Sequence, residues 1–219
     1  MMGEFDYDII WRSLPFLWEG MKVTLLLTVL AIVGGIVFGT LIALIRLAKI
    51  PVISWLAAAY VNFFRSLPLI LVIFWLYFLV PLILGRPVGG FQSVLVAFVL
   101  FETAYYSEII RAGISSVRDG QIAAGRSLGM TNFQTMRFVV LPQAFRAMTP
   151  VLLTQAIILF QDTSLVYVVG LKDFLVSAEL IANRDQRLVE MFVFAAIVYF
   201  IICFTGSQIA RILQKRLST

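Results

Sequence analysis

Long apolar runs separated by short polar stretches dominate this chain. The first run, residues 23–45, contains no charged residue and is bracketed by Lys22 and Arg46. Each of the main runs approaches the ~20 residues that a helix needs to cross a bilayer. The pattern predicts an all-α integral membrane protein, a single transmembrane domain over residues 1–219 with about five transmembrane helices, at residues 23–45, 66–84, 92–111, 150–169 and 190–210.

Composition supports a membrane protein, because 61% of the residues are hydrophobic and only 13% are charged. The N-terminal residues carry Glu4, Asp6 and Asp8, where a secretory signal would carry basic residues, so we expect no signal peptide. Residues 50–64 are too short to span comfortably. With their Trp, Tyr and Asn side chains they suit a helix at the membrane interface.

Missing residue types limit the chemistry. The sequence has no histidine and a single cysteine, Cys203, which excludes His-based acid–base catalysis, His-ligated haem or zinc, and an intramolecular disulfide. It also lacks the G-x-x-x-x-G-K-[ST] phosphate-binding loop, so any ATP is expected on another chain. We therefore expect no cofactor, no metal and no catalytic residue in this chain. The net charge of +5 is no nucleic-acid signature, and we expect no nucleic-acid partner.

The positive charges are unevenly distributed between the two sides of the membrane. With five spans the termini lie on opposite sides. If the C-terminus is inside, eleven of the 17 lysines and arginines fall in inside segments and six in outside segments. The positive-inside rule therefore predicts an outside N-terminus and an inside C-terminus. Residues 112–149 then form a cytoplasmic loop.

The order of residues in this loop predicts two short helices. A helix over residues 120–128 can end at Gly129, which readily adopts a left-handed conformation. Thr131 and Asn132 can cap a second helix over residues 133–140. Small residues at positions 123–125 leave room for a groove of another protein to close over the first helix. The alternative is a surface helix pair that binds no partner.

The loop resembles the EAA loop of bacterial ABC-importer permeases, whose pattern is E-A-A, three residues, G, nine residues and I-x-L-P. Gly129 matches the glycine, residues 130–138 are the nine, and residues 139–142 match the end. Ala124 matches the second position, whereas Ala123 replaces the glutamate and Gly125 the last alanine. Contacts with an ATPase are then expected from Arg118, Arg126 or backbone groups. The resemblance implies an ATPase-coupling role for Gly120, Ala123, Ala124, Gly125, Arg126, Gly129, Leu141 and Pro142.

Further segments are similar to the polar-amino-acid branch of this family, above all to its glutamate/aspartate permeases: residues 60–71, 104–114, 141–150 and 161–170. The resemblance implies a multi-pass permease subunit in the bacterial inner membrane that imports polar amino acids by alternating access. Its partners would be lipid, ABC ATPase subunits that bind ATP and Mg, a second permease subunit, identical or a sister chain, and an amino-acid-binding protein in the periplasm or outside the cell.

Polar residues inside the predicted spans are candidates for a translocation path. Glu102 lies roughly 15 Å into its span at ~1.5 Å per residue, where an ionisable group is functional by default. Tyr105 and Tyr106 share its helix face and can donate hydrogen bonds to it. Glu102 can alternatively fix helix packing. Glu108 and Arg111, spaced i,i+3, predict a local ion pair.

The predicted span 150–169 carries further polar residues, at position 155 and at positions 161–164. The family resemblance implies that this region lies along the translocation path. The candidate path residues are Glu102, Tyr105, Gln155, Gln161, Asp162, Thr163 and Ser164. Packing is again the alternative. Two carboxylates repel an acidic amino acid unless they bind its ammonium or are protonated, and Arg65, Arg184 and Arg187 are the cations available for its carboxylates. Open alternatives are another polar or basic amino acid as substrate, an intramembrane hydrolase using Asp162 and Glu102, and a membrane scaffold or channel.

Overall fold

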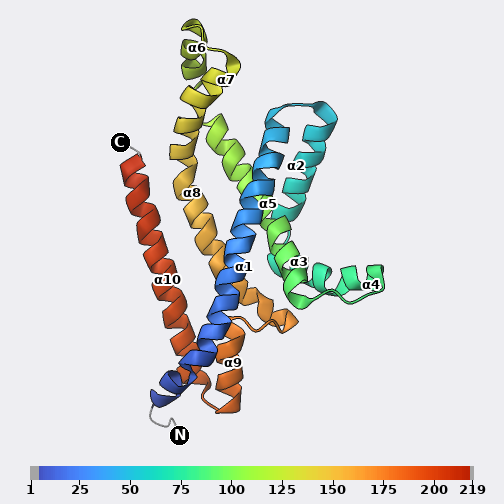
Figure 1. Cartoon of the computed structure of the whole chain (residues 1–219), viewed down its shortest axis with the longest axis vertical. Coiled ribbons are helices and arrows are strands. Elements are labelled where there is room, and N and C mark those ends of the chain that lie inside the picture. Colours follow the sequence, from blue (N-terminus) through green and yellow to red (C-terminus); the bar gives the residue numbers. More distant parts are fainter. Residues whose placement is uncertain (1–4, 218–219) are drawn as a thin grey trace. The chain divides into compact units, whose positions relative to one another are not determined.

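Every regular element of residues 5–217, the part of the chain that the computed structural model describes, is a helix (Figure 1). The all-α prediction is therefore confirmed. In chain order the α-helices and the π- or 3₁₀-helices (η) are α1 (Asp8–Leu47), α2 (Pro51–Arg65), α3 (Leu69–Phe74), η1 (Trp75–Leu79), α4 (Val80–Leu84), α5 (Gly90–Ser115), α6 (Asp119–Ser127), α7 (Asn132–Thr135), η2 (Met136–Val140), α8 (Leu141–Asp162), η3 (Thr163–Val169), α9 (Phe174–Arg184) and α10 (Leu188–Leu217).

Four helical stretches within residues 5–217 are long and apolar enough to cross a membrane: α1, α5, the run 132–169 and α10. Helix α2 and the stretch 69–84 are bent by 104° at their junction and make a fifth span if counted as one. This agrees with the prediction of about five spans. The bend lies at Pro68, because a proline disfavours the α-conformation of the residue before it.

Two prolines are each preceded by a π-helix. Helix η1 ends at Leu79, two residues before Pro81, and η2 ends at Val140, two residues before Pro142. Proline has no N–H for the helical hydrogen bond, and its ring clashes with the preceding turn. A wider turn just before the proline lets each helix continue without a break.

The predicted loop at residues 112–149 is more helical than the sequence indicated. The run from Asn132 continues through η2 into α8, so residues 141–149 form part of a long helix and not part of a loop. The chain reverses instead over residues 116–131, around α6. Hydropathy missed this extension because a helix can continue beyond the membrane once its polar residues face water.

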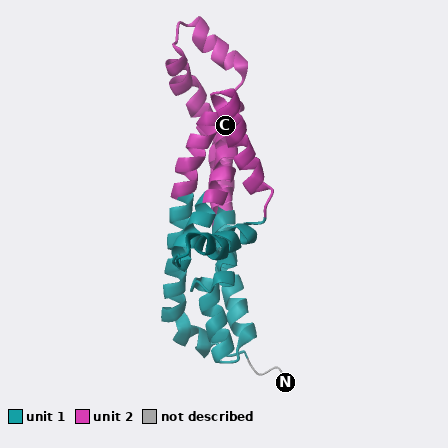
Figure 2. Cartoon of the chain, turned by 90° about the vertical axis from the view of Figure 1, so that its right-hand side faces the viewer, with its two compact units in different colours: residues 1–32, 68–99, 157–205 teal, residues 33–67, 100–156, 206–219 magenta. Residues whose placement is uncertain are grey.

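The described helices fall into two compact units (Figure 2). Unit 1 comprises residues 1–32, 68–99 and 157–205, and unit 2 comprises residues 33–67, 100–156 and 206–219. In unit 1, α9 is the centre of the core, with Phe174, Ala178 and Ile181 packed against Leu17 of α1 and Met191 of α10.

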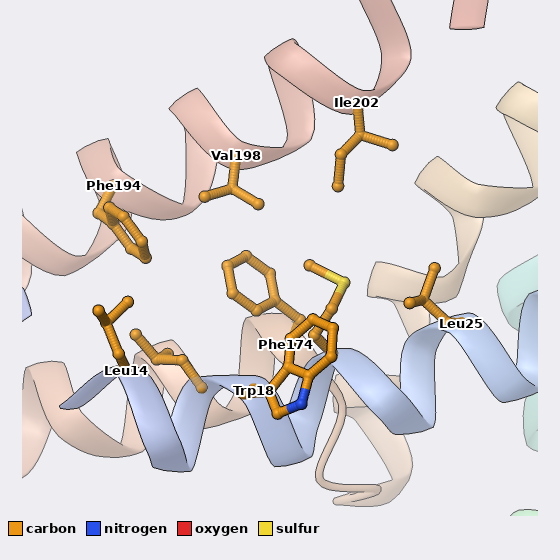
Figure 3. A pocket seen from close by; sticks show the side chains of 9 residues that line it. Leu14, Trp18, Leu25, Phe174, Phe194, Val198 and Ile202 are labelled. Carbon is orange, nitrogen blue, oxygen red and sulfur yellow. The ribbon is translucent and has the colours of Figure 1, made fainter. Parts of the chain in front are cut away.

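An open apolar groove with a volume of about 440 Å³ lies in unit 1 between α1 and α10 (Figure 3). Figure 3 shows side chains from both helices and Phe174 pointing into it. The residues that line it are Leu14, Leu17, Trp18, Met21, Leu25, Phe174, Phe194, Val198 and Ile202.

Unit 2 is held together by close contact between α1 and α5. A Cβ atom on Gly35 would lie 2.8 Å from Cδ2 of Tyr106, and one on Gly39 would lie 2.9 Å from the backbone nitrogen of Ser107. The G-x-x-x-G step formed by Gly35 and Gly39 therefore lets α5 pack closely against α1.

Asp173 fixes the start of α9 in unit 1. Its Oδ1 accepts a hydrogen bond of 2.8 Å from the Val176 N–H, and the Phe174 N–H donates to the Thr24 hydroxyl at 3.0 Å. Asp173 is fully buried, and within residues 5–217 its Oδ2 has no hydrogen-bond partner. Burial raises the pKa of this carboxyl from 3.8 to about 6.

This raised pKa predicts a pH-dependent stability. Between pH 3.8 and about 6 the folded chain binds more protons at Asp173 than the unfolded chain, so its stability decreases as the pH rises. The full change is about 3 kcal/mol at 1.36 kcal/mol per pKa unit. We expect Asp173→Asn, which keeps the capping oxygen, to remove this slope and to be more stable than the parent chain at pH 7. Thermal unfolding in detergent between pH 4 and 7 measures both effects.

The matched control is Asp173→Ala, which removes the charge together with the cap and costs about 1 kcal/mol relative to the asparagine variant. An unchanged pH slope in Asp173→Asn would show that the buried carboxyl does not titrate as described.

Candidate functional site

A carboxylate–amide pair lies in the interior of unit 2. Glu102 of α5 is completely buried, and the Nε2 of Gln155 on α8 lies 3.1 Å from both of its carboxylate oxygens. Gln155 is itself 8% exposed. A buried carboxylate is tolerated only where polar groups compensate the water it has lost. Two candidate path residues that lie 53 positions apart in the sequence are therefore hydrogen-bonded to each other.

Tyr106 does not have the role predicted for it. Within residues 5–217 its hydroxyl is buried without a hydrogen-bond partner. Its ring packs against the backbone of α1 at Gly35, where a side chain would clash with it. The prediction that Tyr106 donates to Glu102 is wrong, and the Gln155 amide of α8 donates to this carboxylate instead.

Tyr105 is held by two neighbours. Its ring lies 5.0 Å from the Phe101 ring, and the Arg65 guanidinium lies 5.5 Å from its centroid. Arg65 is thus positioned by a cation–π contact at the end of α2. The other two cations considered for substrate carboxylates form ion pairs, Arg184 with Asp185 and Arg187 with Glu190.

The predicted ion pair between Glu108 and Arg111 is confirmed, and Arg46 of α1 joins it with Nη1 2.5 Å from Oε2 of Glu108. Arg46 lies 62 residues from Glu108, and no local spacing connects them. The three side chains connect α1 to α5 by charge-assisted hydrogen bonds.

The remaining candidate path residues belong to unit 1. Asp162 ends α8 and is half-buried, and Gln161 beside it is exposed. Thr163 is fully buried and donates its hydroxyl proton to the Phe160 carbonyl at 2.7 Å, while Ser164 is half-buried. The change from α8 to the 3₁₀-helix η3 at Thr163 ends the regular backbone directly after these polar groups.

The loop predicted to be the coupling element has the two caps that the sequence indicated. Helix α6 ends before Gly129, which adopts φ +80°. The Gly129 N–H donates a hydrogen bond of 3.0 Å to the Arg126 carbonyl. Thr131 and Gln134 form a reciprocal capping box at the start of α7. These two caps fix the turn between α6 and the long helix that follows it.

The structure explains one departure from the family pattern. Gly125 is buried against α7, and a Cβ atom there would lie 3.3 Å from Cγ2 of Thr135. An alanine would crowd this contact, so glycine suits the position. The replaced glutamate position, Ala123, is exposed, as is Ala124.

Exposed apolar side chains flank the turn. Leu128 is 80% exposed and Phe133 is 71% exposed. Gly120, Arg126, Gly129 and Pro142 are also exposed, and Leu141 is half-buried. A pocket of about 330 Å³ lies at the base of α6, with Arg118, Gln121 and Gln143 among its lining. Apolar residues with arginines beside them are the composition of a protein-binding surface.

Comparison with known proteins agrees with this architecture. The chain is 50% identical over 222 residues to the glutamate/aspartate import permease protein GltK of Escherichia coli O157:H7, covering 98% of this chain and 99% of the relative. It is 39% identical over 208 residues to the probable glutamine ABC transporter permease protein GlnP of Bacillus subtilis, covering 94% and 95%.

A solved structure described as an amino acid ABC transporter with histidines superposes with a TM-score of 0.91 at 31% identity, over 99% of this chain and 100% of that one. Residues 35–219 match the family described as binding-protein-dependent transport system inner membrane component. The chain therefore belongs to this family of ABC transporter permeases and is a multi-pass protein of the inner membrane.

Proposed function

We propose that the chain is the permease subunit of an ATP-driven importer of glutamate and aspartate. The observation that carries the proposal is 50% identity, over nearly the whole of both chains, to a glutamate/aspartate import permease. Two permease subunits, identical or sister chains, would alternate between outward and inward access around the path.

The charges of the two units support an orientation across the membrane. The unit 2 ranges contain eleven lysines and arginines against three carboxylates, whereas the unit 1 ranges contain six against nine. By the positive-inside rule the ends of the unit 2 helices and α6 face the cytoplasm. The N-terminus is then outside and the C-terminus inside.

The exposed turn around α6 is the proposed docking surface for the ATPase subunits. Leu128 and Phe133 supply apolar contact area, and Arg126 supplies charge next to them. ATP and Mg would be bound by those subunits, since this sequence has no phosphate-binding loop. An amino-acid-binding protein would deliver substrate from outside.

The polar groups that we propose for the translocation path are of two kinds. One is the pair of Glu102 and Gln155, and the other consists of Asp162, Thr163 and Ser164. A carboxylate inside a span can bind the ammonium group that all amino acids share. Arg65, held on the Tyr105 ring, is the cation we assign to a substrate carboxylate. The hydrolase alternative has no supporting geometry, because the Glu102 carboxylate is buried and bonded to Gln155.

Uptake measurements test the substrate. The purified chain is reconstituted in liposomes with its ATPase, any sister permease and its binding protein, and radiolabelled glutamate, aspartate, glutamine and arginine are compared. We expect ATP-dependent uptake of glutamate and aspartate only. Transport of glutamine or arginine alone would identify another polar or basic amino acid as substrate. ATP-independent flux would contradict an importer.

Gly129→Val tests the coupling turn. Valine at φ +80° costs about 1–2 kcal/mol and tilts α6 relative to α7, so we expect uptake and substrate-stimulated ATP hydrolysis to fall at least tenfold. The matched control is Gly85→Val, at φ +63° and likewise without atoms within 4 Å of the added Cβ. Equal losses of uptake in both variants would show that α6 has no special part in coupling.

A further inference from the structure

A second groove lies in unit 2, between α8 and the end of α10, with a volume of about 400 Å³. Its lining combines polar and apolar side chains. Gln143, Arg146 and Gln214 provide the polar part, and Ala147, Val151 and Leu217 provide the apolar part. Both helices belong to stretches that are long and apolar enough to span a membrane, so the groove lies on helices that can contact lipid.

Two exposed arginines accompany the groove. Arg146 lines it on α8, and Arg211 lies three residues before Gln214, which lines it on α10. After Glu190, α10 carries no carboxylate. Of the three carboxylates in the unit 2 ranges, Glu102 is hydrogen-bonded to Gln155, Glu108 is paired with Arg46 and Arg111, and Asp119 lies in the first turn of α6. The electrostatic complement of the groove is therefore an anion.

The lining also indicates what kind of anion binds. Guanidinium groups bind phosphate oxygens in a fork, and the amide groups of Gln143 and Gln214 can donate to the same oxygens. The apolar lining residues of α8, which follow Arg146 by one to five residues, suit hydrocarbon beneath such a headgroup. Aromatic side chains, the usual anchors of protein interfaces, are absent from the lining residues.

We propose that this groove binds the headgroup phosphate of an anionic phospholipid from the cytoplasmic leaflet. Basic pockets between transmembrane helices on this side of a membrane are suited to such headgroups. The lipid would join α8, which leads directly from the coupling turn, to α10. The choice of leaflet rests on the orientation given under the proposed function, whereas binding itself does not.

Native mass spectrometry of the delipidated importer complex, titrated with phosphatidylglycerol or phosphatidylcholine, tests the proposal. We expect phosphatidylglycerol to bind preferentially, and Arg146→Gln and Arg211→Gln each to weaken it about fivefold, the effect of ~1 kcal/mol per cation. The matched control is Arg184→Gln, an exposed arginine of unit 1, which should leave lipid binding unchanged.

Equal binding of the two lipids, or unchanged binding in the two groove variants, overturns the proposal. So does competition by inorganic phosphate alone, which would indicate a free-anion site. Loss of the ATPase or of the second permease from the complex, without loss of lipid, would make the groove a protein interface.

Orientation is tested separately by impermeant maleimide on Ser127→Cys in a Cys203→Ala background. Labelling from outside the cell would contradict the proposed orientation and leave the lipid measurement standing.

Discussion

Replacing Gly39 of α1 by leucine is expected to destabilise the chain by about 3 kcal/mol and to abolish transport. A Cβ atom at this position would lie 2.9 Å from the Ser107 nitrogen and 3.2 Å from the Thr103 carbonyl oxygen. Both are backbone atoms of α5, so the clash can be relieved only by moving the helices apart, which costs more than a side-chain adjustment. Thermal unfolding in detergent and uptake in liposomes measure the two effects.

Gly39→Ala and Gly120→Ala form the matched pair for this prediction. The Cβ at Gly120 in α6 would meet no atom within 4 Å, and alanine favours a helix by up to 1 kcal/mol over glycine. We expect the first variant to lower the unfolding temperature and the second to keep or raise it. Similar behaviour of both would show that α1 and α5 are not in close contact.

The contact at Gly39 matters for function because of what lies one turn away on α1. A Cβ atom on Gly35 would lie 2.9 Å from Cβ of Glu102 and 2.8 Å from Cδ2 of the Tyr106 ring. Separating α1 from α5 would therefore open the wall beside the Glu102 carboxylate. Water entering there would compete for the hydrogen bonds from Gln155.

Local features of the site could be predicted from the sequence because they depend on residues a few positions apart. The turn at Gly129, the cap at Thr131 and the pair of Glu108 with Arg111 all involve separations of at most four residues. The G-x-x-x-G spacing of Gly35 and Gly39 likewise indicates that some helix packs closely against this one, although it does not indicate which helix. In each case backbone geometry or helix periodicity restricts which residues can contact each other.

Contacts between distant segments could not be predicted in this way. Gln155 reaches Glu102 across 53 residues, and Arg46 reaches Glu108 across 62. Side chains on a helix face can be identified from spacing, but which helix they face depends on packing of the whole chain. The prediction for Tyr106 failed for this reason, because spacing within α5 carries no information on Gly35 of α1 or on the Gln155 donor of α8.

Helix lengths were underestimated for a related reason. Hydropathy reports which residues suit lipid, whereas a helix ends where caps or prolines stop it. Helix α1 begins at Asp8, fifteen residues before the apolar run, and its 40 residues extend about 60 Å. Similarly, α8 passes Pro142 because the preceding π-helix accommodates this proline.

Gln155→Leu is expected to cost about 3 kcal/mol, because it leaves a buried carboxylate without the amide that now bonds both of its oxygens. The same exchange at Gln208, half-buried on α10, is the control and should change stability by less than about 1 kcal/mol. Thermal unfolding in one detergent compares the two. A small effect at Gln155 would mean that other contacts compensate Glu102.

The double variant Glu102→Gln with Gln155→Leu distinguishes the two roles considered for Glu102, which are helix packing and binding of the substrate ammonium group. Removing the charge together with its partner should restore most of the lost stability, since no buried carboxylate remains at position 102. If Glu102 serves only packing, uptake recovers with stability. Because a carboxylate on the path binds the substrate ammonium, we expect the double variant to be stable and still inactive, with ATP hydrolysis no longer stimulated by substrate.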